Sequence, residues 1–200
     1  MWWEGVFELA GYAAEWLFSD DAEERKRQKE RKHMPIVPIS ELPDSSRTWV
    51  FGSDRTLDSS KSTQLLKEVD RFLGQWKAHG APLTSGRDWK HARFLMVAVD
   101  QSTEGASGCS IDGLFRALKA LEPQLGASLV TSGLIFYRDA KGEVQSVDRE
   151  RFGSLSAHGR VSADTTVFDP TVTTLGEWKA KFENRAKDSW HAGLLQNQPA

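Results

Sequence analysis

The sequence predicts an α+β fold, mixed α/β in part, in which helices pack on one central sheet. The body of the chain opens with two strand-then-helix units, at 47–79 and 89–121. A glycine-containing turn at 139–142 then separates two apolar runs, which is typical of an antiparallel hairpin. Short helical patterns fill the C-terminal part. Because consecutive β-α units favour parallel strands, we expect parallel pairing beside the antiparallel hairpin.

Length and charge indicate a single soluble domain without general affinity for polyanions. The chain has 200 residues, enough to bury a sizeable core, and its 39% apolar and 27% charged residues are typical of globular proteins. A formal net charge of −2 creates no overall field that would attract nucleic acid or anionic membranes. The single cysteine can form no internal disulfide, which fits a reducing compartment, so we expect a cytoplasmic protein.

Residues 1–33 form a leader that differs in composition from the rest of the chain. Within it, residues 2–18 place aromatic and apolar residues on one side and three glutamates on the other, at helical spacing. Such an amphipathic helix would contact a partner, a membrane surface or the protein's own body. The stretch is too short and too acidic to span a bilayer. A further alternative is that translation starts at Met34, in which case the leader is not made.

The first strand and helix follow a segment rich in proline. Residues 34–46 contain three prolines and are expected to be an extended linker. A strand is expected at 47–52 and a helix at 63–79, which Gly80 and Pro82 would end. The helix is inferred from apolar residues that share one face, namely Leu65, Leu66, Val69, Phe72, Leu73 and Trp76.

The second strand is expected at 89–100. Its apolar run, 94–99, holds no polar residue, which indicates a central strand covered on both faces. The second helix is expected at 111–121, closed by Pro123 and Gly126. Its inward face would consist of Ile111, Leu114, Phe115, Leu118 and Leu121.

The C-terminal part is expected to add three short strands and two helices. The strands are predicted at 129–138, 143–147 and 165–168, and the helices at 149–157 and 175–184. No break marks a second domain, so 47–195 is expected to be one domain, followed by the tail 196–200.

The loop between the second strand and the second helix is the strongest candidate site. An apolar strand leads into a loop of small residues and then into a helix start, where free N–H groups and the positive dipole end attract anions. The residues expected to contact such a ligand are Asp100, Glu104, Ser107, Gly108, Ser110 and Asp112. As alternatives, Asp100 would cap its own loop and the serines would cap the helix.

Cys109 lies where this helix begins. A helix start favours the thiolate, so Cys109 is a candidate nucleophile, with His191 or His158 as its base. The alternative is a small buried residue at a tight junction, which is common for free cysteine. Trp190 would anchor the C-terminal residues as they fold back over the site.

Several arginines lie beside the predicted strands and suit phosphate or carboxylate groups. Arg138 is the one expected to contact the ligand; Arg47, Arg55 and Arg160 would converge with it, or all four would be scattered over the surface. No metal site is expected, because five histidines without paired spacing and one cysteine do not form a ligand set. No cofactor is indicated.

The chain resembles an uncharacterised family of small bacterial proteins, some of which carry the label "ABC transporter ATPase". The resemblance covers nearly everything from residue 46 onward. It is carried by RTWVFGSDRTL (47–57), QWKAHGAPL (75–83), 94–112, FYRD (136–139), 167–178 and SWHAGLL (189–195). An ATPase of that class needs a Gly-x-x-x-x-Gly-Lys-Ser/Thr loop, which this sequence lacks, so the label implies no ATPase activity here.

Residues 135–178 also resemble small GYF-type modules, which are associated with binding proline-rich or apolar peptides. The pattern runs as an aromatic strand, a glycine hairpin, a short helix, Thr-x-Val-aromatic and a Trp. Phe168-Asp169 stands where that pattern usually has a Trp. The resemblance implies a sub-module at 135–182.

The function expected first is that of an intracellular, non-catalytic binding module. It would hold an anionic ligand or a protein partner at the 100–112 loop. The first alternative is a cysteine-dependent enzyme that uses Cys109, and the second is a peptide-binding adaptor that uses the GYF-like region.

Overall fold

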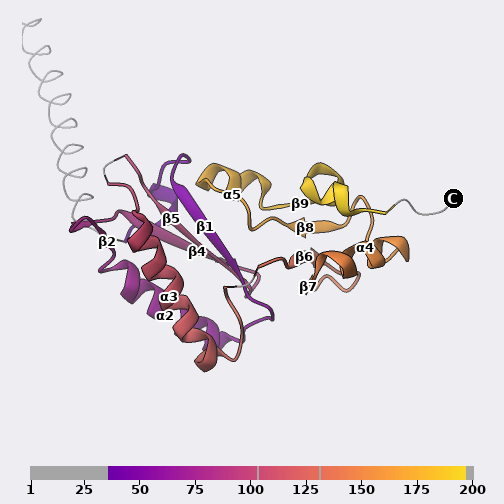
Figure 1. Ribbon diagram of the computed structural model, residues 1–200, viewed down its shortest axis with the longest axis horizontal. Coiled ribbons are helices and arrows are strands. Elements are labelled where there is room, and N and C mark those ends of the chain that lie inside the picture. Colours follow the sequence, from indigo (N-terminus) through magenta and orange to yellow (C-terminus); the bar gives the residue numbers. More distant parts are fainter. Residues whose placement is uncertain (1–35, 103, 131, 197–200) are drawn as a thin grey trace, which may run out of the picture.

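The computed structural model of the protein describes residues 36–102, 104–130 and 132–196, and it contains two main sheets (Figure 1). The α+β class is confirmed. The first sheet has the strand order β1-β5-β4 and the second has the order β7-β6-β8-β9; a small hairpin, β2–β3, stands apart. Every pair of these strands is antiparallel, so the expected parallel pairing within one central sheet is wrong.

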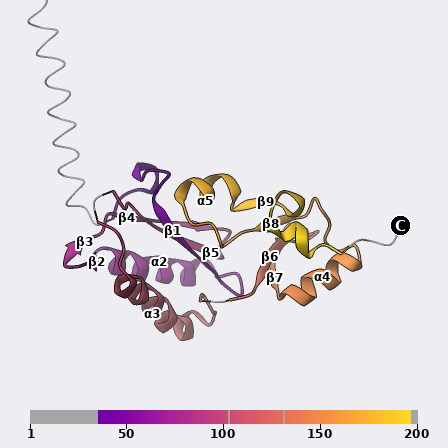
Figure 2. The ribbon, with the colours of Figure 1, turned by 45° about the horizontal axis from the view of Figure 1, so that its top comes forward.

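The first sheet consists of β1 (Arg47–Gly52), β4 (Ser85–Lys90) and β5 (Phe94–Val99). All six residues of β5 are buried, which confirms the central strand that its apolar run predicted. The helices α2 (Ser59–Leu73) and α3 (Gly108–Leu125) cover one face of this sheet (Figure 2). The other face is covered by aromatic residues from the second sheet and from α5 (Leu175–Lys181).

Parallel pairing was expected because one strand, β4, was not recognised. The chain leaves α2 at Leu73, six residues before the expected end, and forms β2 (Lys77–Ala78) and β3 (Ala81–Pro82). It then runs through β4, turns, and returns as β5 between β1 and β4. The single strand expected at 89–100 is therefore a hairpin, and β5 enters the sheet antiparallel to β1.

The second sheet consists of β6 (Ile135–Arg138), β7 (Val144–Val147), β8 (Thr166–Phe168) and β9 (Glu183–Arg185). β6 and β7 form the predicted hairpin. The remaining elements of this part are α4 (Arg149–Ala157) and the 3-10 helices η2 (Ala186–Asp188) and η3 (Trp190–Leu194). β9 takes the place of the last residues of the helix expected at 175–184.

Residues 36–46, expected to be a linker, pack on the first sheet. Ile36 forms a parallel bridge with Ser85, and the 3-10 helix η1 (Ile39–Glu41) follows. Val37 and Leu42 are buried in the core. The leader, Met34 and residues 197–200 lie outside the described residues.

Two close approaches join the two sheets. Phe94 lies 5.0 Å, between ring centroids, from Phe136, Phe168 and Phe182, so one aromatic cluster fills the space between them. A Cβ on Gly52 would lie 2.8 Å from Cε2 of Phe136, so only glycine allows this contact. Within the described ranges, no helix combines the length and apolar character needed to cross a membrane.

We expect a substitution in the turn between β4 and β5 to stabilise the protein. His91 (φ 55°) and Ala92 (φ 52°) both occupy the left-handed region, and Arg93 N–H closes the turn onto Lys90 O at 3.0 Å. This conformation costs a residue with a Cβ roughly 1–2 kcal/mol. The extra freedom of glycine in the unfolded chain offsets roughly 0.4–1 kcal/mol of that. Ala92→Gly should therefore raise the free energy of unfolding by about 0.5 kcal/mol.

Urea denaturation measures this difference. The control is Ala120→Gly on the exposed side of α3, which should lower the free energy of unfolding by about 1 kcal/mol. If both variants lost stability equally, the turn would hold no strain.

Candidate functional site

The loop expected to bind an anion uses its polar groups to hold its own backbone. Asp100 Oδ1 accepts a hydrogen bond from the Ser102 N–H at 2.9 Å. Ser107 caps α3: its Oγ accepts from the Ser110 N–H at 3.3 Å and its carbonyl from the Ile111 N–H at 3.0 Å. These contacts correspond to the capping alternative for Asp100 and the serines.

The other predicted residues of this loop do not gather around one point. Ser110 is buried, its Oγ donates to Ser107 O at 2.8 Å, and its carbonyl accepts from Trp76 Nε1 at 2.8 Å. Glu104 is half-buried, while Gly108 and Asp112 are exposed. The free N–H groups expected to attract an anion are thus limited to the exposed first turn of α3.

The structure does not bring Cys109 and its predicted base together. Cys109 is exposed at the start of α3, which packs against α2 and β2 beside the first sheet. His191 belongs to η3 and His158 caps α4, both beside the second sheet (Figures 1 and 2). Neither histidine is placed to take a proton from the thiol.

His191 is a core residue. Its side chain is 0% exposed, Nδ1 lies 3.0 Å from Ser189 Oγ, and Nε2 has no hydrogen-bond partner among the described residues. The ring stacks on Trp190 with centroids 3.9 Å apart. Burial lowers the pKa of His191 to about 4, because charging the ring would cost its hydration. It is a neutral part of the packing behind Trp190.

The predicted convergence of arginines occurs for two of the four. Arg55 and Arg138 line one hollow, the arginine cleft, together with Arg93 and His91. Arg47 instead lies over the ring of Trp49, 4.9 Å from its centroid, and Arg160 is exposed after α4. Arg138 therefore lies at a polar hollow, although not at the 100–112 loop.

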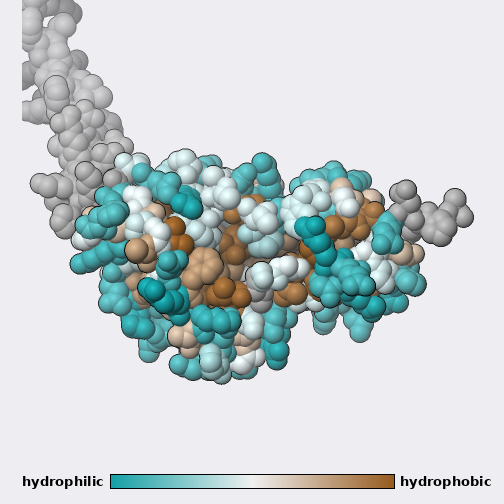
Figure 3. Space-filling view, viewed as in Figure 1, coloured by the Kyte–Doolittle hydropathy of each residue, from teal (hydrophilic) through white to brown (hydrophobic). Residues whose placement is uncertain are grey.

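A different hollow forms where the two sheets meet, and we name it the junction cavity. Its volume is about 470 Å³, within the usual range of small-molecule sites. In the view of Figure 3, apolar residues reach the surface in the middle of the molecule, on the face turned toward the reader. The cavity is lined by Val50, Gly52, Gly133, Leu134, Ile135, Phe136, Arg149, Pro170, Thr171 and Trp190.

The polar features of the junction cavity are few. Among the described residues that line it, Arg149 is the only charged one. Its guanidinium lies 5.5 Å from the Trp190 ring centroid, and it forms no ion pair within the described part of the chain. Trp190 is 38% exposed, unusual for so large an apolar ring. The hollow thus offers one unmatched positive charge above apolar walls.

The edge of β1 adds backbone groups to this cavity. The Thr48 N–H donates outward to Thr173 O at 2.8 Å, away from β5. Because hydrogen-bonding direction alternates along a strand, the N–H and C=O of Val50 also point outward, toward the cavity that Val50 lines. These groups can orient a polar part of a ligand.

Sequence reasoning identified Trp190 but missed Arg149 and Val50. Arg149 looks like an ordinary first residue of α4, whose start is capped by Asp148. No sequence signal marks it, because its neighbours in the cavity come from distant segments.

Comparisons of the chain with protein-family models, with curated proteins and with solved structures found no match. The resemblance to the bacterial family and to GYF-type modules therefore stays a prediction. In the ranges that the structure describes, no three His, Cys, Asp or Glu side chains are grouped to hold a metal ion.

Proposed function

We propose that this protein is a non-catalytic binding protein whose junction cavity holds a small anion with an apolar body. One observation carries the proposal: Arg149, unmatched by any described carboxylate, stands over apolar walls at a cavity of ligand size. A guanidinium recognises carboxylate and phosphate through charge-assisted hydrogen bonds. Apolar walls with a few placed polar groups are typical of small-molecule sites between packed units.

The two parts of the ligand would have separate contacts. Its acidic group would pair with Arg149, and its apolar body would lie against Leu134 and Phe136. Trp190 would close over that body, as the sequence predicted for this residue, although at another site. The Thr171 hydroxyl already donates to Asp169 Oδ1 at 2.6 Å, which leaves Arg149 as the main recognition group.

Three expectations from the sequence remain proposals beside this one. An anion or a protein partner would bind at the exposed start of α3, Cys109 would act as a nucleophile, or residues 135–182 would bind a peptide. The exposed thiol of Cys109 is compatible with the second, but the histidines expected to serve it lie elsewhere. We keep the cytoplasm as the proposed location.

Three probes that share an eight-carbon chain but differ in charge test the proposed function. Octanoate should bind, measured by calorimetric titration and as a rise in Tm, because it supplies both an acid and an apolar chain. Octanol and octylamine share the chain but lack the negative charge, and they should bind far more weakly. Arg149→Gln should raise the Kd for octanoate about tenfold or more, since a hydrogen bond to a charged group contributes roughly 1.5–3 kcal/mol.

Arg151→Gln is the matched control, because Arg151 is exposed on the same helix and does not line the cavity. It should leave octanoate binding unchanged. Equal binding of all three probes, or equal losses in the two variants, would show that Arg149 does not select an anion.

A further inference from the structure

The outer edge of β1 is covered by an extended segment of the chain along part of its length. The Leu175 N–H donates to Ser46 O at 2.9 Å. Two residues further along β1, the Thr48 N–H donates to Thr173 O at 2.8 Å. Bonds of this kind are typical of an antiparallel strand pair. Residues 173–175 therefore lie on the start of β1 as a short added strand.

This cover ends before Val50. The Thr173 N–H turns away from β1 and donates to Glu177 Oε2 at 3.0 Å. The Thr171 N–H likewise donates elsewhere, to Asp169 Oδ1 at 2.9 Å. Within the described ranges, no group bonds to the outward N–H and C=O of Val50, which is half-buried. The edge of β1 is thus open where it borders the junction cavity, and an open edge can pair with another extended chain.

A simple fatty acid would leave this edge without a partner. Its one polar group pairs with Arg149, and its alkyl chain offers neither a donor nor an acceptor to Val50. A peptide supplies both, because one residue can exchange two hydrogen bonds with the residue opposite it in an antiparallel pair. That residue must precede the last one of the peptide, since its carbonyl has to belong to an amide and not to the terminal carboxylate.

The orientation of Val50 determines where the side chains of such a peptide would lie. The Val50 side chain packs against the aromatic cluster between the sheets, as does that of Leu134. Residues directly opposite each other share one face of a sheet, so the penultimate side chain of the peptide would point to the same apolar walls. The next residue ends in the carboxylate, and Arg149 lines the same cavity.

Arg149 is available for that carboxylate. The closest acidic residue along the segment that lines the cavity is Asp169, which precedes Pro170. Its Oδ1 already accepts from the N–H and the hydroxyl of Thr171, at 2.9 and 2.6 Å. In the part of the chain that the structure describes, Asp169 forms no ion pair with Arg149.

We propose that the junction cavity holds the carboxyl-terminal end of a peptide chain, bound as an added strand on the edge of β1. The penultimate residue exchanges two hydrogen bonds with Val50, its apolar side chain lies against Leu134 and Phe136, and the terminal carboxylate pairs with Arg149. This inference rests on the proposed function, because it names the class of ligand for the same cavity. Unlike the peptide binding implied by the GYF-like region, it requires a free terminal carboxylate and the edge of β1.

The probe is N-acetyl-glycyl-leucyl-glycine, titrated calorimetrically into the full chain. Replacing its leucyl N–H by an ester oxygen removes the donor to Val50 C=O and should weaken binding roughly two- to tenfold. The matched control is an ester one position earlier, which removes the glycyl N–H that faces away from β1 and should leave binding unchanged. Amidation of the terminal carboxylate should weaken binding about tenfold or more, as should Arg149→Gln but not Arg151→Gln.

A loss of affinity in the leucyl ester but not in the control ester supports the inference. Equal affinities of the two esters overturn it, because the peptide would then not pair with β1. If octanoate binds through Arg149 and the peptide does not bind, this inference fails while the proposed function stands. If neither binds, both fail.

A longer peptide with the same three final residues separates two sources of this chemistry. Binding equal to that of the short probe supports the tail of a protein as the ligand. Binding by the short probe alone supports a free short peptide.

Discussion

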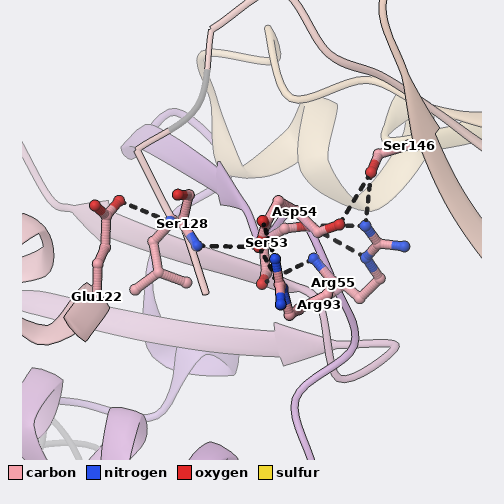
Figure 4. A network of polar contacts seen from close by, with 8 residues as sticks. Ser53, Asp54, Arg55, Arg93, Glu122, Ser128 and Ser146 are labelled. Atoms are coloured by element: carbon pink, nitrogen blue, oxygen red, sulfur yellow. Dashed lines mark hydrogen bonds and ion pairs between the residues drawn. The ribbon is translucent and has the colours of Figure 1, made fainter. Parts of the chain in front are cut away.

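Arg93→Met should lower the free energy of unfolding by about 3 kcal/mol or more, because it removes several hydrogen bonds from a buried charged group. The guanidinium joins the loop after β1 to β7 through Ser53, Val144 and Ser146 (Figure 4). Methionine retains an apolar stem but leaves these acceptors without a donor in a site that water barely reaches. Two carbonyls would lose hydrogen bonds, at a cost of roughly 1–3 kcal/mol each.

Urea denaturation with Arg87→Met as control measures this loss. Arg87 also lies in the first sheet, at β4, but it pairs with Asp70 at 2.6 Å and both side chains are partly exposed. The pair is bidentate, with a second contact from Nη2 to Oδ2 at 2.7 Å, but its partial exposure keeps its contribution on the order of 1 kcal/mol, well below the loss expected for Arg93→Met. If Arg93→Met were no less stable than Arg87→Met, Arg93 would not join the two sheets.

Stability should also fall as the pH drops from about 6.5 to about 4, in part because of His191. Burial lowers the pKa of this ring to about 4 in the folded protein, whereas an unfolded histidine titrates near 6.5. Between these values the unfolded chain binds more protons, so protonation favours unfolding. The contribution is complete above pH 6.5 and lost progressively as the pH falls to about 4, on the order of 3 kcal/mol in all.

His191→Phe should remove this part of the pH dependence. Phenylalanine keeps a flat ring between Phe152 and Trp190 but does not titrate. Carboxylates titrate in both proteins, so the difference between their unfolding free energies at pH 7 and pH 4 isolates the imidazole. His158→Gln, at an exposed position, should retain the full pH dependence. Equal slopes for His191→Phe and the unaltered protein would contradict a buried neutral ring.

Periodicity predicted the elements more reliably than the pairing between strands. The apolar run of β5 and most of the inward faces of α2 and α3 follow from side-chain patterns alone. The expectation for Phe115 on α3 is wrong, because this ring is 37% exposed and touches the core only edge-on, at Phe51. The β4–β5 hairpin does not, because its turn uses His91 and Ala92 rather than glycine or asparagine. One unrecognised turn changed the predicted sheet, since it hid a strand and reversed the direction of the next.

The sites were less predictable than the elements, for a related reason. Trp190 could be singled out because a tryptophan near the C-terminus must find apolar contacts. The cavity that it lines, however, combines β1, the segment before β6, α4 and the loop after β8. Their meeting depends on how the two sheets pack, which no local pattern encodes. The predicted pairing of Cys109 with His191 was wrong for the same reason, because the two residues belong to parts of the chain that pack beside different sheets.

A crystal structure of the full chain with octanoate would test the proposed function most directly. The carboxylate should lie within hydrogen-bonding distance of the Arg149 guanidinium, with the alkyl chain against Phe136 and beneath Trp190. Octanoate bound at Gly108 and Cys109, or in the arginine cleft while the junction cavity stays empty, would contradict it.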